Sequence, residues 1–200
     1  RRGIKMRFLC SARIKPASVE LFEVMDKAGF EAIGFGLETG SEKLLKSIHK
    51  NITHEDVVNT FEMLKGRNMR IATYLMVGFP GENRDTVAET IALMKKLQKI
   101  RYFEFAGVAL LWVYPNTEVY EIMKAAGRIG DSFWLTDGDV PYFTLEHSEE
   151  ELHEMVTAIT LACMPWRQGV KKAVHEILHP LATAKKIIPR IRRLKKYFYR

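Results

Sequence analysis

Cysteine is nearly absent from this chain of 200 residues. Cys10 and Cys163 are the only two, and they stand so far apart that no CxxC-type metal motif exists. Isolated thiols of this kind are typical of buried, unpaired cysteines in a reducing compartment. We therefore expect both thiols to be buried and free.

Long apolar runs are missing as well. No stretch approaches the roughly 18–20 apolar residues that span a bilayer. The chain opens with Arg1-Arg2-Gly3 rather than with a basic tip and an apolar segment, so it shows no signal peptide. We expect a cytoplasmic protein. The absence of an initial Met, a few residues before a strand-like segment, is typical of a chain whose beginning is cut off.

Acidic residues are missing from the end of the chain. Residues 185–200 hold eight basic residues and no acidic one, although the chain as a whole has a net charge of only +7. The remaining basic residues nearly balance the 24 acidic ones, so the basicity is local to this tail. Ile187, Ile191, Leu194 and Phe198 share one helical face within it. Such a helix suits an anionic membrane surface or nucleic acid, or docks on its own protein by its apolar stripe.

Segments typical of strands and of helices alternate along the chain. The strand-like segments are residues 5–10, 32–38, 69–77 and 102–113. The residues placed to cap the helices are Ser18, Ser41, Thr53, Thr86 (with Glu89) and Ser148. Four strand–helix units indicate an α/β fold with a parallel sheet in sequential strand order and helices on one side. Four units do not close a barrel, so either further chain completes one or this is a small doubly wound domain.

The composition divides the chain into three parts. Residues 1–127 hold the strand–helix units. Residues 128–184 hold an irregular segment and two C-terminal helices, the second over 166–179, and residues 185–200 form the basic tail.

Candidate functional residues follow the strands. Ligands of parallel α/β proteins bind at the carboxyl ends of the strands. Ser11 and Arg13 follow the first strand, Glu38 closes the second, and residues 78–82 and 114–117 close the third and fourth. A carboxylate at such an edge can accept hydrogen bonds from both hydroxyls of a ribose. In the alternative, Glu38 only caps the helix that follows it.

Three of these strand ends resemble one known family. Residues 34–45 (GFGLETGSEKLL), followed by Lys50 and Thr53, are similar to the fourth-strand signature of radical S-adenosylmethionine (SAM) enzymes. Residues 76–82 (MVGFPGE) resemble the fifth strand of that family, and residues 114–120 (YPNTEVY) resemble the end of its sixth, with Asn where Gly is usual. The resemblance is closest to the group that contains methylthiotransferases, oxygen-independent coproporphyrinogen oxidases and cobalamin-dependent members. It covers about residues 5–125.

The resemblance implies the C-terminal part, about four βα units, of a partial TIM-type (β/α)6 barrel followed by C-terminal helices. It also implies a [4Fe–4S] cluster, held by a CxxxCxxC loop, that cleaves SAM to a 5′-deoxyadenosyl radical acting on an unknown small-molecule substrate. This chain lacks that loop, and Cys10 and Cys163 cannot replace three close thiolates. We therefore expect the chain alone to bind no cluster and to be inactive. Its helical C-terminus resembles the cobalamin-dependent branch, in which the complete protein would also bind cobalamin.

Carried over by position, the resemblance assigns SAM contacts to seven residues. These are Ser11, Arg13, Glu38, Lys50, Tyr74, Met76 and Gly78. The first two supply polar contacts, Glu38 accepts hydrogen bonds from SAM, Lys50 meets its carboxylate, and the last three lie near the adenine. Glu82 fits the adenine-side pattern poorly because its loop is one residue too long, so we interpret it as a helix-start residue.

Two other functions stay open from the sequence. One is a non-catalytic α/β module that binds a nucleotide-like ligand, although no GxGxxG or P-loop follows any strand. The other is a scaffold that binds a membrane or a nucleic acid through the basic tail. A CxxxCxxC motif in preceding sequence would favour the enzyme over both.

Overall fold

The computed structural model describes residues 6–136 and 138–165. The described residues up to Cys163 form one compact unit. The helix predicted over 166–179 and the basic tail over 185–200 lie outside the described residues. The proposed boundaries at residues 127 and 184 stay predictions.

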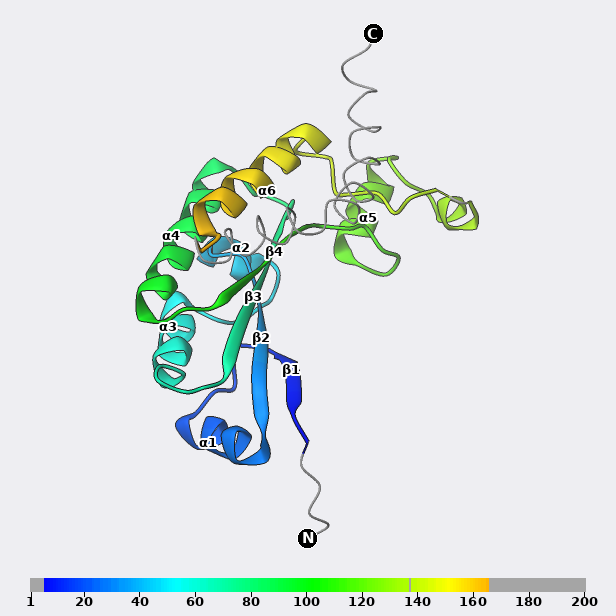
Figure 1. The fold of residues 1–200 in the computed structure, drawn as a ribbon. Helices are drawn as coiled ribbons and strands as arrows, with labels where there is room; N and C mark the ends of the chain where they lie inside the picture. The colour runs from blue at the N-terminus through cyan, green and yellow to red at the C-terminus, as the bar shows by residue number, and fades with distance from the viewer. Residues whose placement is uncertain (1–5, 137, 166–200) are drawn as a thin grey trace, which may run out of the picture. The chain divides into compact units, whose positions relative to one another are not determined.

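Four parallel strands form one sheet in the order β1-β2-β3-β4 (Figure 1), which confirms the predicted pairing and strand order. The strands are β1 (Phe8–Ala12), β2 (Phe30–Glu38), β3 (Arg70–Val77) and β4 (Glu104–Leu110). The fourth ends three residues before the predicted limit because the chain then leaves the sheet. There the Val113 amide donates to the Pro141 carbonyl at 2.9 Å, and the Phe143 amide donates to the Leu111 carbonyl at 3.0 Å.

The helices begin at side-chain caps that the sequence largely predicts. They are α1 (Val19–Ala28), α2 (Glu42–Ser47), α3 (His54–Met63), α4 (Arg84–Ile100), α5 (Glu118–Ala125) and α6 (Glu149–Cys163), with a 3-10 helix at Asp131–Leu135. Ser18 accepts from the Leu21 amide, and Thr53 forms a capping box with Asp56. Among the described residues, no helix combines the length and the apolar character needed to cross a bilayer.

Two predicted caps are wrong in detail. Helix α4 begins three residues earlier than predicted, because the Asn83 side chain accepts from the amides of Asp85 and Thr86. Thr86 is instead the inner member of this capping box, and its hydroxyl accepts from the Asn83 amide at 2.9 Å. Ser41 stands at the start of α2 but makes no capping bond, and its hydroxyl is buried without a partner in the described structure.

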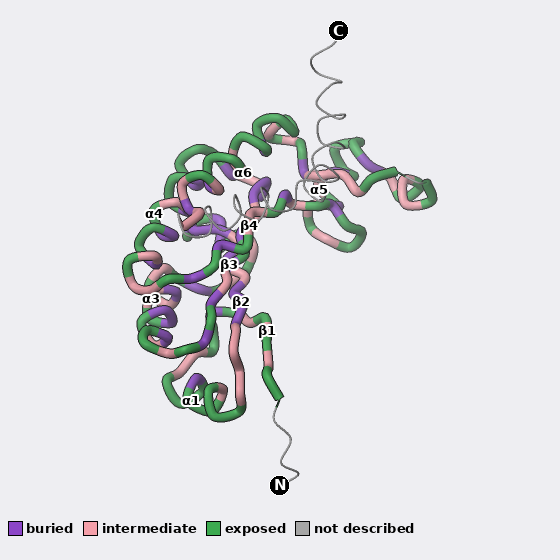
Figure 2. Tube along the Cα trace, in the orientation of Figure 1, coloured by how far each residue is buried: buried purple, intermediate pink, exposed green. Residues whose placement is uncertain are grey.

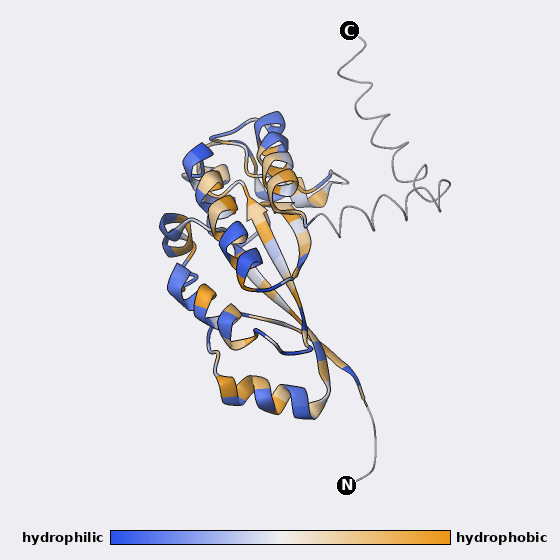
Figure 3. Ribbon diagram, turned by 60° about the vertical axis from the view of Figure 1, so that its left-hand side comes forward, coloured by the Kyte–Doolittle hydropathy of each residue, from blue (hydrophilic) through white to orange (hydrophobic). Residues whose placement is uncertain are grey.

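The described helices cover one face of the sheet. Helices α1, α3 and α4 lie on the same side of the strands in Figure 1, as predicted, and α6 packs against α4 and β4. Alternate residues of β2 and β3 are buried on that side: Ile33, Phe35, Leu37, Ile71, Thr73, Leu75 and Val77. The residues between them are small or partly exposed, and Figure 2 shows β1 without buried residues. In Figure 3 the apolar residues of the helices recur along their length, typical of helices with one buried face.

Phe61 on α3 lies at the centre of the core between helices and sheet. Its side chain is fully buried. Its ring centroid lies 5.3 Å from that of Phe103, edge to face, and 6.2 Å from that of Phe35 on β2. These aromatic contacts join α3 to the strands on either side of β3.

The two cysteines differ. Cys163 is buried and unpaired as expected, and burial raises the pKa of its thiol to about 11. Cys10 is free but only partly buried, which corrects the prediction. It lies on the edge strand β1, which has a neighbouring strand on one side alone.

The turn between β3 and α4 buries Glu82, which is only 3% exposed. Its carboxylate accepts hydrogen bonds from the amides of Gly78 at 2.6 Å and Phe79 at 3.1 Å. Glu82 therefore closes this turn before the helix begins, rather than starting the helix. Burial raises the pKa of the Glu82 carboxyl, against the opposing effect of the two amides and of His147.

Replacing Phe61 by Ala should lower the free energy of unfolding by about 3–5 kcal/mol, because the buried ring leaves a cavity. Urea unfolding followed by circular dichroism measures this. The matched control is Leu161→Ala on α6, since Leu161 is 79% exposed. Its effect should stay within about 0.5 kcal/mol. Similar losses in both variants would contradict the assigned core.

Replacing Glu82 by Gln should change how stability depends on pH. With its pKa raised on folding, Glu82 favours the folded state below its unfolded pKa, and this contribution is lost as the pH rises through the folded pKa. The stability of the parent chain relative to Glu82→Gln should therefore fall as the pH rises above the ordinary glutamate pKa of about 4.3. Urea unfolding at a series of pH values above this pKa measures the difference. The exposed Glu154→Gln is the control, and a difference that rises with pH would refute the assignment.

Candidate functional site

A salt bridge closes the carboxyl end of β2. Lys50 Nζ lies 2.7 Å from Glu38 Oε1, and the two side chains are 16% and 22% exposed. A charge-assisted hydrogen bond of this length in a half-buried position holds both groups in place. Glu38 is thus paired with a lysine rather than capping α2, which excludes the alternative interpretation of this residue.

The backbone on both sides of this pair adopts the left-handed region. Glu38 has φ of 66°, and His49 and Asn51, which flank Lys50, have φ of 55° and 52°. Such residues cost of order 1–3 kcal/mol each unless their surroundings fix them. Helix α2 contributes to fixing Lys50, whose amide donates to the Leu45 carbonyl at 2.9 Å. These conformations turn the chain so that Lys50 returns to the end of β2.

Two glycines of β2 make room for the site. A Cβ at Gly36 would lie 2.5 Å from Glu38 Oε1 and 3.5 Å from Lys50 Nζ. A Cβ at Gly34 would lie 2.8 Å from the ring of Tyr74. A side chain at either position would displace Glu38 or Tyr74. The sequence interpretation missed this role, although the spacing of the two glycines placed both on one face of the strand.

Five of the seven predicted residues line one open cleft of about 520 Å³. The complete lining is Ser11, Ala12, Arg13, Gly36, Glu38, Lys50 and Tyr74. Arg13 Nη2 donates to the Lys50 carbonyl at 3.2 Å, so the β1–α1 loop supports the loop that carries Lys50. Residues up to 63 positions apart in sequence meet here because the parallel strands end at the same edge.

Met76 and Gly78 lie outside the residues that line this cleft. Met76 follows Tyr74 on the same face of β3 and is half-buried. The Gly78 amide donates to Glu82, and its φ of 99° serves the β3–α4 turn. These two predicted residues therefore do not line the cleft with the other five.

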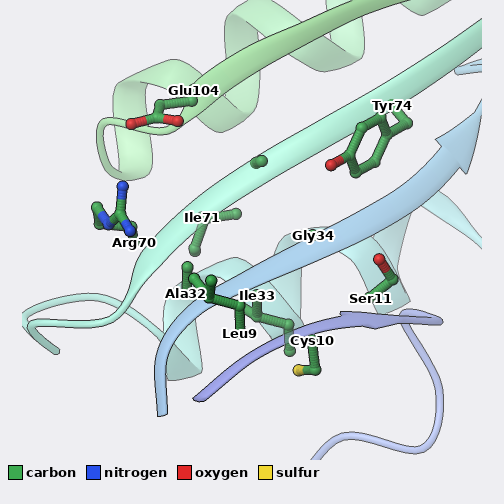
Figure 4. A pocket seen from close by; sticks show the side chains of 11 residues that line it. Leu9, Cys10, Ser11, Ala32, Ile33, Gly34, Arg70, Ile71, Tyr74 and Glu104 are labelled. Carbon is green, nitrogen blue, oxygen red and sulfur yellow. The ribbon is translucent and has the colours of Figure 1, made fainter. Parts of the chain in front are cut away.

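A second cavity of about 330 Å³ extends along the bare face of the sheet (Figure 4). Tyr74 and Ser11 line both cavities, so they form the boundary between them. In Figure 4 the Ser11 side chain points toward Tyr74, whereas the Cys10 sulfur points the other way. Arg70 and Glu104 lie at the far end, where β3 and β4 begin.

Metal binding has no support in the described residues, where no group of three or more His, Cys, Asp and Glu side chains could hold an ion. The whole sequence offers two widely spaced cysteines. The residues of this chain therefore do not fit a [4Fe–4S] cluster, which needs three close thiolates. The cleft itself offers a carboxylate, an ammonium, a guanidinium and a hydroxyl, a donor set that suits a polar organic ligand.

Comparison with known proteins gives one matching family model and several relatives. A family model described as the radical SAM superfamily matches residues 1–94. An uncharacterized methyltransferase of Pyrococcus horikoshii is 25% identical over 150 residues, 74% of this chain and 32% of that protein. A tRNA-2-methylthio-N(6)-dimethylallyladenosine synthase of Carboxydothermus hydrogenoformans is 30% identical over 150 residues, 74% of this chain and 29% of that protein. The chain thus spans about a third of the length of these relatives.

Two solved structures share the fold. Coproporphyrinogen III oxidase from Escherichia coli, described as a radical SAM enzyme, aligns with a TM-score of 0.53 at 13% identity, over 78% of this chain and 32% of its own. A radical SAM methyltransferase from Kitasatospora setae, with tryptophan substrate and a SAM analog bound, aligns with a TM-score of 0.50 at 19% identity, over 61% of this chain and 23% of its own. The matched residues 1–94 carry β1 to β3 and the whole cleft, so the part of this chain that is similar to the radical SAM superfamily contains the candidate site.

Proposed function

We propose that this chain provides the SAM-binding edge of a radical SAM enzyme whose cluster is held by other residues. The observation that carries the proposal is the Glu38–Lys50 pair, which lies at the end of a parallel strand in a cleft with Ser11, Arg13 and Tyr74. The similarity of residues 1–94 to the radical SAM superfamily supports the chemistry, and the position of the cleft at the carboxyl edge of the sheet supports its use for a ligand.

Each polar group of the cleft has a role in this proposal. Lys50 occupies Glu38 Oε1, and the carboxylate retains further acceptor sites for the ribose hydroxyls of SAM. The remaining ammonium protons of Lys50 meet the carboxylate of the methionyl group. Arg13 holds the Lys50 loop through its carbonyl, and the Tyr74 ring, 47% exposed over Gly34, lies beside the adenine.

A [4Fe–4S] cluster bound by other residues would supply the electron for the reductive cleavage of SAM. Its ligands lie outside this chain, so this chain alone is expected to be inactive. The residues described here would position SAM by its ribose and its methionyl carboxylate at the carboxyl edge of the sheet. The cavity of about 330 Å³ on the other side of Tyr74 would then hold the small-molecule substrate.

The reaction subtype divides two ways. The Pyrococcus relative is named a methyltransferase, which favours transfer of a methyl group, and in the cobalamin-dependent branch that reaction would add cobalamin to the complete protein. The Carboxydothermus relative is named a methylthio synthase acting on tRNA, which favours methylthiolation. The alignments with these two relatives have the same length, 150 residues, so alignment length favours neither reaction. Membrane or nucleic-acid contact through the basic tail and a cytoplasmic location remain expectations.

Replacing Glu38 by Ala in the complete, cluster-loaded protein should weaken SAM binding roughly 5- to 150-fold, equal to about 1–3 kcal/mol. The change removes an acceptor and leaves Lys50 unpaired in a half-buried position. Calorimetric titration with SAM measures the loss. Glu31→Ala is the matched control, because Glu31 lies near the opposite end of the same strand and pairs with Arg7. Glu82→Ala should leave SAM binding unchanged. A loss of SAM affinity in Glu82→Ala that equals or exceeds the loss in Glu38→Ala would mean that the SAM site is assigned to the wrong strand.

The 200-residue chain should bind no iron–sulfur cluster, because three close thiolates are lacking. Anaerobic reconstitution with iron and sulfide should leave less than one cluster per chain. Iron analysis and visible absorption measure this. The Cys10→Ser and Cys163→Ser variants should give the same result as the parent. Binding of four irons per chain that depends on either cysteine would contradict the assignment of the cluster to other residues.

A further inference from the structure

A row of aromatic side chains follows β4, and we refer to Trp112, Tyr114, Trp134 and Tyr142 as the aromatic ladder. The Trp112 and Tyr114 rings are nearly parallel, at 9° with centroids 6.4 Å apart. The Tyr114 and Trp134 rings follow at 21° and 6.2 Å. Tyr142 stands edge-on to Trp112 at 83° and 5.4 Å. Three rings thus face the same way along one row, and the fourth closes its end.

The backbone beneath the ladder is held on both sides. The Leu111 amide donates to the Val77 carbonyl at 2.8 Å, and the Val113 amide donates to the Pro141 carbonyl at 2.9 Å. Val113 is fully buried in a small core with Tyr120 and other apolar residues. Because side chains alternate along an extended segment, Trp112 and Tyr114 lie opposite Val113. The two rings therefore stand on a fixed support.

The two central rings nevertheless remain accessible. Trp112 is 40% exposed and Tyr114 is 49% exposed. Centroid separations above 6 Å exceed the spacing of rings in full face-to-face contact, about 3.5 Å, so the rings do not cover one another completely. Large aromatic side chains that are rigid and accessible are the surfaces on which proteins stack flat rings.

Two basic side chains lie close to the ladder, and both are paired with acids: His153, whose ring is 6.4 Å from that of Tyr142, lies 3.6 Å from Glu149, and Lys124 lies beside Tyr120, whose ring is 6.3 Å from that of Trp134. Lys124, which lies 5.9 Å from the centroid of the Tyr120 ring, is bound by both carboxylate oxygens of Asp131 at 2.9 and 2.7 Å. Its charge is therefore already neutralised by a partner. Stacking on a π surface, rather than attraction of a phosphate, is the recognition that this arrangement offers.

The ladder continues from the edge of the sheet that carries the SAM cleft. Glu38 pairs with Leu75 across β2 and β3, and Leu75 pairs with Val108 on β4. Trp112 follows Val108 by four residues and lies past the end of β4 at Leu110. The ladder thus lies beyond the cleft, and none of its four residues lines either cavity described above.

We propose that the aromatic ladder binds the flat, uncharged, conjugated ring of a ligand by stacking on Trp112 and Tyr114. The ring can belong to a free small molecule or to a base of single-stranded RNA, since both present the same π face. This site is separate from the SAM cleft and does not depend on the function proposed for it.

Titration of the 200-residue chain with indole, followed by NMR, tests the proposal, with cyclohexanol as a probe of similar size that is not flat. Indole should bind and shift the ladder resonances, and cyclohexanol should bind at least fivefold more weakly. Trp112→Ala should weaken indole binding roughly 5- to 150-fold, the range for loss of one stacked ring. Trp112→Phe, which keeps a ring, should lose less than Trp112→Ala.

Two further variants make the test specific. Tyr114→Leu keeps apolar bulk but removes the ring, so it should weaken indole binding as well and serves if Trp112→Ala fails to fold. Tyr102→Ala is the control, because Tyr102 is 49% exposed but precedes β4 at the opposite end of the strand. Comparison of uridine with an oligouridine strand identifies the source: tighter binding of the strand indicates RNA, and equal binding indicates a free ring. Indole binding that matches cyclohexanol, or that survives both ladder variants, overturns the proposal.

Discussion

Burial of one face of the four-stranded sheet is the constraint on which the rest of the structure depends. Right-handed crossovers place α1, α3 and α4 on the same side, and Phe35, Phe61 and Phe103 fill the space between the layers. The opposite face keeps small side chains and both cavities. Because all strands run in parallel, their carboxyl ends meet at one edge, and this brings the β1–α1 loop, Glu38 and Lys50 together.

The cleft depends on two glycines, which have no side chain, as much as on the polar residues that line it. Gly36 leaves the space that the Glu38 carboxylate occupies, and Gly34 leaves the space beneath the Tyr74 ring. The left-handed backbone at Glu38 and around Lys50 adds conformational cost, which the adjoining β2 and α2 offset. A site with this construction holds its two charged groups in a defined geometry before any ligand arrives.

Glu38 and Glu82 show how position decides the use of the same side chain. Glu38 is the last residue of β2, and Glu82 follows the end of β3 by five residues. Glu82 turns inward and satisfies two backbone amides, so its charge is buried at a cost that raises its pKa. Glu38 meets a lysine in an open cleft and keeps acceptor capacity toward solvent. The first carboxylate stabilises a turn, and the second is available to a ligand.

The parallel sheet, its strand order and most helix caps could be predicted from the sequence, and so could the strand ends at which polar residues gather. These features depend on short-range periodicity and local hydrogen bonds. The sequence also indicated five of the seven residues of the cleft lining. Tertiary structure alone decided that Glu38 pairs with Lys50, that Gly34 and Gly36 are spacers, that Asn83 rather than Thr86 caps α4, and that Trp112 joins Tyr142. These contacts join segments distant in sequence or choose between two adequate local signals, and packing between elements makes that choice.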